Sequence, residues 1–166
     1  MKIHIAIVSD QTLANLIPIL MDPPDRVCLI CSDAMDGRGL ASRFIKLLEK
    51  ESLKVETKLH APISDIGAIR KYAVMLREDI LSQYSGAEII LNATGGTKLM
   101  ALAFVDVFRD IADKIIYTDT SHRRIEVFPN PSGNALSPVQ MRNVLDVPHY
   151  LEAQGFCYLN ARSDNA

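Results

Sequence analysis

The stretch "ILNATGGTKLMALAF", Ile90 to Phe104, joins two apolar runs through a short polar turn. The first run begins at Ala87 and has the length and composition of a buried strand. The second, from Leu99 to Ile111, is long enough for a helix and carries apolar residues around most of its circumference. A strand that passes through such a turn into a helix is typical of α/β proteins.

Apolar runs of strand length alternate with helical patterns on both sides of this stretch. We predict strands at residues 2–8, 26–32, 53–61, 87–93 and 114–120, and helices at 12–21, 39–51, 66–80 and 99–111. Ser64 is the expected cap of the third helix. A turn at residues 121–123 and a last strand at 124–129 would close the sheet as an antiparallel hairpin.

This alternation predicts an α/β fold: a Rossmann-like three-layer sandwich with a mostly parallel sheet and a closing antiparallel hairpin. We expect the strand order 3-2-1-4-5. Residues 1–131 would form one ligand-binding domain, and residues 132–166 a C-terminal connector with a short helix near His149.

Ligands of such sheets bind beyond the carboxyl ends of the strands, where the strand order reverses. In the expected order the reversal lies between the strands at residues 2–8 and 87–93. The loops that leave these two strands, Ser9–Thr12 and Asn92–Lys98, are short and rich in hydroxyl groups. We therefore predict that the two loops meet and form one ligand site.

The second loop has the chemistry of a phosphate site. Gly95 and Gly96 allow a ligand to approach the main chain closely. The free N–H groups of the following helix attract an anion, Thr94 and Thr97 add hydroxyl groups, and Lys98 adds a positive charge.

Each of these features also has a plainer interpretation. The glycines could form an ordinary turn with Thr97 as a helix cap, and Ser9, Asp10 or Thr12 could cap the first helix. Asn92 could be satisfied at the end of the sheet. The "SHRR" segment at residues 121–124 could be a solvated hairpin tip or a basic lip over an anion.

Several classes of protein are disfavoured. The formal net charge is −2 and the pI about 6.1, which argues against a general nucleic-acid-binding surface. The sequence lacks the P-loop motif and has no G-x-G-x-x-G after the first strand. The histidines lack the spacing of metal ligands, so we expect no metal and no cofactor; His4 is expected as a half-buried core residue.

Three cysteines, Cys28, Cys31 and Cys157, suggest reduced thiols in a cytoplasmic protein. The first two lie in an apolar run, which favours a buried strand over a metal site. No apolar run is long enough to span a membrane.

The helix at 99–111 must be buried on several sides because few of its positions are polar. We predict a symmetric homodimer in which this helix forms part of the contact and brings two Gly-Gly loops near the twofold axis. The alternative is that the C-terminal segment around Tyr150 and Phe156 covers this helix.

The Asn-x-Thr-Gly-Gly-Thr-Lys pattern at Asn92–Lys98, the Ser9–Thr12 loop and the closing hairpin resemble CARF domains, the CRISPR-associated Rossmann fold. The likeness is closest to the N-terminal CARF domain of CARF–nuclease effectors of type III CRISPR systems and covers residues 2–131. The segment "HYLEAQGF" resembles the start of their connector.

The resemblance implies a dimeric sensor of cyclic oligoadenylate in antiviral defence, with a fused or separate nuclease effector. We expect cyclic tetra-adenylate, although residue types do not distinguish the ring sizes. Together, the loops and the resemblance predict ligand contacts by Ser9, Asp10, Gln11, Thr12, Asn92, Thr94, Gly95, Gly96, Thr97 and Lys98.

Some CARF domains also cleave their ligand as metal-independent ring nucleases, through attack of a ribose 2′-OH that leaves a 2′,3′-cyclic phosphate. Candidate residues for such a reaction here are Ser9, Thr97 and Lys98. The sequence offers no obvious general base, so any cleavage would be slow. A Rossmann-like enzyme or regulator that uses another nucleotide, such as NAD or ATP, is the third possibility.

Overall fold

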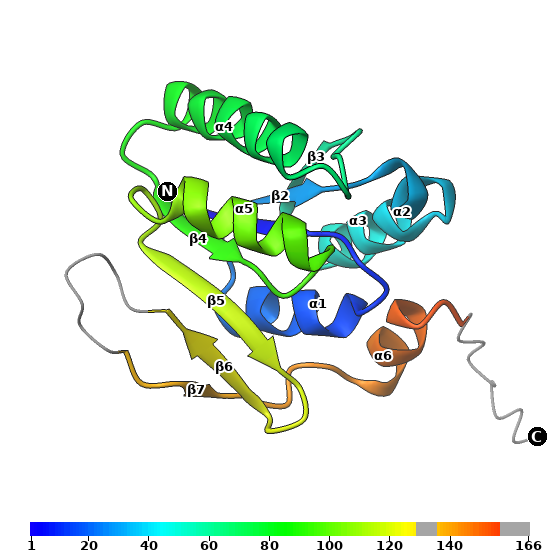
Figure 1. Cartoon of the computed structure of the whole chain (residues 1–166). Coiled ribbons are helices and arrows are strands. Elements are labelled where there is room, and N and C mark those ends of the chain that lie inside the picture. Colours follow the sequence, from blue (N-terminus) through cyan, green and yellow to red (C-terminus); the bar gives the residue numbers. More distant parts are fainter. Residues whose placement is uncertain (129–135, 157–166) are drawn as a thin grey trace, which may run out of the picture.

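Residues 1–128 and 136–156 are described by the computed structural model (Figure 1). The strands are β1 (Lys2–Ile7), β2 (Arg26–Ile30), β3 (Lys54–Lys58), β4 (Glu88–Asn92), β5 (Lys114–Asp119), β6 (Arg124–Val127) and β7 (Val139–Gln140). The helices are α1 (Thr12–Met21), α2 (Asp33–Gly37), α3 (Leu40–Lys50), α4 (Ile66–Gln83), α5 (Lys98–Phe108) and α6 (Val147–Ala153). None of these helices is both long enough and apolar enough to cross a membrane.

The strands form one sheet in the order β3-β2-β1-β4-β5-β6-β7. β1 to β5 are mutually parallel, and β6 and β7 are antiparallel to their neighbours. The predicted order of the first five strands and the predicted closing hairpin are therefore confirmed. β1 and β4 lie side by side, which places the reversal of strand order where the sequence predicts it.

The helices cover both faces of the sheet and complete a three-layer sandwich (Figure 1). α4 and α5 pack on one face, where Ile3, Ile5 and Ile7 of β1 join Ile69 and Phe104 in a single core. α1, α3 and α6 cover the other face. Side chains of β1 alternate between the two cores because successive residues of a strand point to opposite faces.

Three local features differ from the sequence-based expectation. Asp65, not Ser64, caps α4: its Oδ1 accepts hydrogen bonds from Gly67 N at 2.8 Å and Ala68 N at 3.1 Å. Both residue types cap helices well, and because α4 begins at Ile66, Asp65 rather than Ser64 holds the cap position. Two elements were not predicted, α2 and β7, because segments of five and two residues are too short to show a period.

The C-terminal segment contributes to the same sandwich. β7 extends the sheet beside β6, and α6, close to the predicted helix, packs against α3 and α1. The expected boundary between residues 131 and 132 lies outside the described residues.

Cys28 and Cys31 are buried in and just after β2, as predicted for a core strand. Burial raises the pKa of the Cys28 thiol to about 12, so this thiol stays protonated and unreactive at neutral pH. Cys157 lies outside the described residues.

The Gly-Gly turn between β4 and α5 packs directly onto the end of β1. A Cβ atom on Gly95 would lie 1.8 Å from the carbonyl oxygen of Ile7, and one on Gly96 would lie 2.5 Å from Ile7 Cγ2. Gly96 also has a φ of +76°, which side chains rarely adopt. Packing within the chain is therefore sufficient to require both glycines.

His4 is fully buried rather than half-buried, with 1% of its surface exposed. Burial lowers the pKa of its imidazole to about 3, although Asp22 acts in the opposite direction and Lys2 reinforces the decrease. The ring is therefore neutral in the folded protein.

We expect Gly95→Ala to lower the free energy of unfolding by about 1–3 kcal/mol or more, because the new methyl group overlaps main-chain atoms that cannot move independently. The control is Gly37→Ala, where a Cβ meets no atom within 4 Å. Chemical denaturation of both variants measures the difference. Equal stabilities would contradict the close packing of this turn onto β1.

The buried His4 makes stability depend on pH. Below pH 6.5 the unfolded chain binds a proton at this imidazole that the folded protein excludes, so the free energy of unfolding falls as the pH decreases. Between pH 7.5 and 5 the loss at this single site is about 2 kcal/mol. Between these two pH values, the free energy of unfolding of the wild type, measured by urea denaturation, should fall by about 2 kcal/mol more than that of His4→Leu. Equal decreases in the two proteins would contradict a neutral buried ring.

Candidate functional site

The two predicted ligand loops meet at one small pocket at the carboxyl ends of the strands. Ser9 and Asp10 line it from the loop after β1, and Gly96 and Thr97 line it from the loop after β4. The pocket has a volume of about 170 Å³. Because β1 and β4 are adjacent and parallel, their following loops are brought to the same edge of the sheet.

Other elements complete the walls of this pocket. The full lining consists of Val8, Ser9, Asp10, Ser32, Ala34, Met35, Ile63, Gly96, Thr97 and Met100. Polar groups from the two loops thus face apolar side chains from α2, α5 and the segment before α4. Such a mixture suits a ligand that has both polar and flat apolar parts.

The first loop presents one free hydroxyl group and one paired carboxylate. Ser9 Oγ is buried and has no hydrogen-bond partner among the described residues. Asp10 is exposed and forms an ion pair with Arg38, with 2.6 Å between Asp10 Oδ1 and Arg38 Nη2. Gln11 occupies the cap position of α1 without a side-chain hydrogen bond, and Thr12 is buried. The interpretation of Ser9, Asp10 or Thr12 as the helix cap is therefore wrong.

The second loop is held by hydrogen bonds among its own polar side chains. Buried Asn92 Oδ1 accepts from Thr94 N at 3.0 Å and from Thr94 Oγ1 at 2.5 Å. Thr94 Oγ1 in turn accepts from Thr118 N at 2.8 Å, which ties the turn to β5. Asn92, Thr94 and Gly95 lie outside the pocket lining and shape the turn.

Thr97 lines the pocket while it also caps α5. Its Oγ1 accepts from Met100 N at 3.2 Å and donates to the carbonyl oxygen of Ile63 at 2.9 Å. The cap interpretation is therefore confirmed. Because the hydroxyl proton is already used, Thr97 is a weaker candidate than Ser9 for orienting a reacting group.

The open end of α5 offers positive potential beside the pocket. The first main-chain bond that returns to this turn runs from Ala101 N to Thr97 O, so the N–H groups of Lys98 and Leu99 precede the helical ladder. The Lys98 side chain is exposed and forms no ion pair in the part of the chain that the structure describes. An anion near this end would gain from both the helix dipole and the ammonium group.

The contribution of the loop after β2 was not predicted from the sequence. Ser32 directly follows this strand and lines the pocket, and Arg38 reaches Asp10 from the end of α2. The segment "CSD" at residues 31–33 does not flank the reversal of strand order, but it leaves the carboxyl end of β2, the other parallel neighbour of β1, and therefore lies at the same edge of the sheet. Nothing in the sequence pairs Arg38 with Asp10.

The hairpin tip at residues 121–124 does not line the pocket. Asp119 Oδ1 accepts a hydrogen bond from His122 N at 3.1 Å, and Asp119 Oδ2 lies 2.7 Å from His122 Nδ1. Both contacts lower the pKa of the Asp119 carboxyl. Arg124 pairs with Glu126 at 2.5 Å. Two of the four tip residues, His122 and Arg124, are thus paired within the hairpin, which favours the solvated-tip interpretation.

Known proteins resemble this chain over most of its length. The family described as the Card1 CARF domain matches residues 3–150. The structure of Can2 from Sulfobacillus thermosulfidooxidans in complex with cyclic tetra-adenylate is 30% identical, with a TM-score of 0.77; the match covers 95% of this chain and 42% of that one. No curated protein sequence matches significantly.

Two more distant structures share the fold. Protein VC1899 from Vibrio cholerae is 19% identical with a TM-score of 0.79, and the match covers 92% of this chain and 39% of that one. Csm6 from Enterococcus italicus, bound to cyclic hexa-2′-fluoro-hexa-dAMP, is 22% identical with a TM-score of 0.61, and the match covers 70% and 33%. The chain spans less than half the length of these proteins, and it belongs to the Card1 CARF domain family.

Proposed function

We propose that this CARF domain is a sensor that binds cyclic oligoadenylate in type III CRISPR defence. The observation that carries the proposal is the convergence of Ser9 and Asp10 with Gly96 and Thr97 on one pocket, at the reversal of strand order. The similarity to Can2, described in complex with cyclic tetra-adenylate, supports this class of ligand.

The chemistry around the pocket fits one unit of such a ligand. The open N-terminus of α5 and the Lys98 ammonium group attract a phosphate. The unpartnered Ser9 hydroxyl can bond a ribose or phosphate oxygen, and the side chains of Met35, Ile63 and Met100 offer an apolar surface to a base. These groups come from four separate segments, so the folded domain, rather than one motif, recognises the ligand.

Cyclic tetra-adenylate is the ring that we propose. The match to Can2, described in complex with cyclic tetra-adenylate, is 30% identical and covers 95% of this chain. The match to Csm6, bound to an analogue with six nucleotides in the cycle, is 22% identical and covers 70%. The pocket of about 170 Å³ is too small to enclose a ring of four nucleotides. The remainder of the ring would therefore lie across the neighbouring surface and a second protomer.

We propose a homodimer whose contact includes α5. Leu102 is 65% exposed and Leu99, one turn earlier, is 39% exposed, so the described residues leave an apolar face of this helix uncovered. The alternative, that the segment around Tyr150 covers α5, is wrong for the described residues. α6, which contains Tyr150, packs against α3 and α1 on the opposite face of the sheet (Figure 1). A face beside the Gly-Gly turn would bring two copies of the pocket together about a twofold axis.

Binding without rapid cleavage is the activity that the geometry favours. In the part of the chain that the structure describes, no histidine lines the pocket, and the Asp10 carboxylate is paired with Arg38. The Thr97 hydroxyl is already a donor to Ile63 O. Ser9 and Lys98 remain, and they supply orientation and charge but no general base at neutral pH.

We predict that the protein binds cyclic tetra-adenylate and that Lys98→Ala weakens binding by about 1.5–3 kcal/mol, the range for a charge-assisted hydrogen bond. Calorimetry with cyclic tri-, tetra- and hexa-adenylate, NAD and ATP measures the preference. The control is Lys54→Ala, which removes an exposed lysine at the amino end of β3, the opposite edge of the sheet.

Retention of NAD or ATP with no response to the cyclic ligands would overturn the proposal. Equal affinities for the wild type and the Lys98 variant would remove this side chain from the site. Ligand recovered from the same mixtures in EDTA should be intact, and linear products would show a metal-independent ring nuclease instead.

Leu102→Glu should convert the dimer into a monomer, because it places a charge in the middle of the proposed apolar contact. The matched control is Met75→Glu on α4, where the native side chain is 61% exposed. Light scattering coupled to size-exclusion chromatography measures the mass of each variant. A wild type that is monomeric, or a Leu102 variant that remains dimeric, would contradict the contact.

A further inference from the structure

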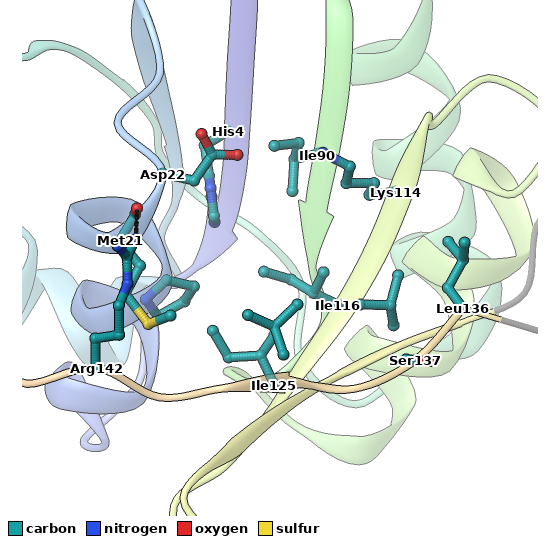
Figure 2. A pocket seen from close by; sticks show the side chains of 13 residues that line it. His4, Met21, Asp22, Ile90, Lys114, Ile116, Ile125, Leu136, Ser137 and Arg142 are labelled. Atoms are coloured by element: carbon teal, nitrogen blue, oxygen red, sulfur yellow. Dashed lines mark hydrogen bonds between the residues drawn. The ribbon is translucent and has the colours of Figure 1, made fainter.

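A second, larger pocket lies between the sheet and the C-terminal segment. It has a volume of about 350 Å³, and its walls are mainly apolar side chains of β4, β5 and β6, with α1 and β7 at its sides. Figure 2 shows Ile90, Ile116 and Ile125 across its middle, with His4 and Asp22 at one side and Leu136 at the other. None of its lining residues lines the pocket between the two loops.

His4 is a buried polar side chain in the wall of this pocket. Its Nδ1 and Nε2 atoms both lack a hydrogen-bond partner among the described residues, and 1% of the side chain is exposed. A buried polar group without a partner carries a free-energy cost, and native proteins normally satisfy such groups. The ring thus offers one donor and one acceptor at the edge of an apolar space.

Two of the three charged groups at the rim form ion pairs with other parts of the chain. Asp22 pairs with Lys2, and Lys114 pairs with Glu88 at 3.2 Å. Arg142 Nη2 donates to the carbonyl oxygen of Met21 at 2.8 Å, a bond that Figure 2 marks with a dashed line. Arg142 has no carboxylate partner among the described residues, but apart from His4 the buried part of the wall is apolar, which favours an uncharged ligand body.

Water is a poor occupant of this space. A buried water molecule is well held when it has two to four polar partners. Apart from His4, the buried residues of the lining are Pro18, Met21, Ile90, Ile116 and Ile125. A molecule that covers the apolar walls and still satisfies the imidazole would gain more. A hydroxyl group serves either ring nitrogen because it both donates and accepts a hydrogen bond.

We propose that this pocket binds a small, uncharged, largely apolar molecule whose single hydroxyl group forms a hydrogen bond with the imidazole of His4. The apolar body lies on Ile90, Ile116 and Ile125, and the hydroxyl group is directed towards β1. This site is independent of the proposed cyclic oligoadenylate site.

The test compares two probes that differ by one hydroxyl group, 4-propylphenol and propylbenzene, titrated into the full chain. Backbone amide NMR locates the binding, and the shifts give the affinities. We expect saturable binding at the residues of this pocket, with the phenol bound about fivefold to tenfold more tightly, the effect of one net hydrogen bond. Amide shifts at the Gly-Gly turn should change little.

Two variants distinguish the contribution of the His4 hydrogen bond to probe affinity from that of the apolar pocket. His4→Leu should bind both probes with nearly equal affinity, because only the phenol loses a partner. Val127→Phe, at a half-buried position in the pocket wall, should weaken the binding of both probes by filling the space. Circular dichroism confirms that each variant is folded.

Failure of both probes to saturate the wild type would overturn the proposal. Equal affinities for the two probes in the wild type, or an undiminished preference for the phenol in a folded His4→Leu protein, would also overturn it. Loss of cyclic tetra-adenylate binding in other experiments would leave this result unaffected, because no residue is shared between the two pockets.

Discussion

The structure depends on the contact between the turn after β4 and the end of β1. Gly95 lies so close to the carbonyl oxygen of Ile7 that no side chain fits between them, and Asn15 Nδ2 donates to the same oxygen at 2.8 Å. This contact keeps the two central strands in register at their carboxyl ends. It therefore places the Ser9–Asp10 loop and the first turn of α5 around one pocket.

The glycines show how one requirement can serve both folding and binding. Packing alone requires glycine at both positions of the turn, because a side chain at either one would overlap Ile7. The same tight turn leads into the first main-chain N–H groups of α5, which precede the hydrogen bonds of the helix. A test of ligand binding by a bulky substitution at Gly96 would confuse the two effects, whereas the exposed Lys98 side chain can be removed without disturbing the turn.

Much of the architecture follows from the sequence because the decisive patterns are long. The apolar runs of β1, β2 and β4 and the polar loops that follow β1 and β4 predict the strand order and the place of the site. Short elements such as α2 and β7 have too few residues to show a period. The roles of Asn92 and Thr94 were not predictable either, because hydrogen bonds within a turn depend on its three-dimensional course.

Long-range pairs show the same limit. Residue types indicate that Asp10 is polar and exposed, but only the fold brings Arg38 to it. The alternation of β1 predicts that His4 faces one side of the sheet, yet its complete burial depends on distant segments that the sequence does not place beside it. The second pocket is for this reason visible only in the structure.

A backbone amide NMR titration of the wild-type protein with cyclic tetra-adenylate tests most directly whether the loops after β1 and β4 form one ligand site. We expect the largest changes in amide shift to fall together on Ser9, Asp10, Ser32, Gly96 and Thr97. Changes confined to one of the two loops, or to the opposite edge of the sheet around Lys54, would contradict it.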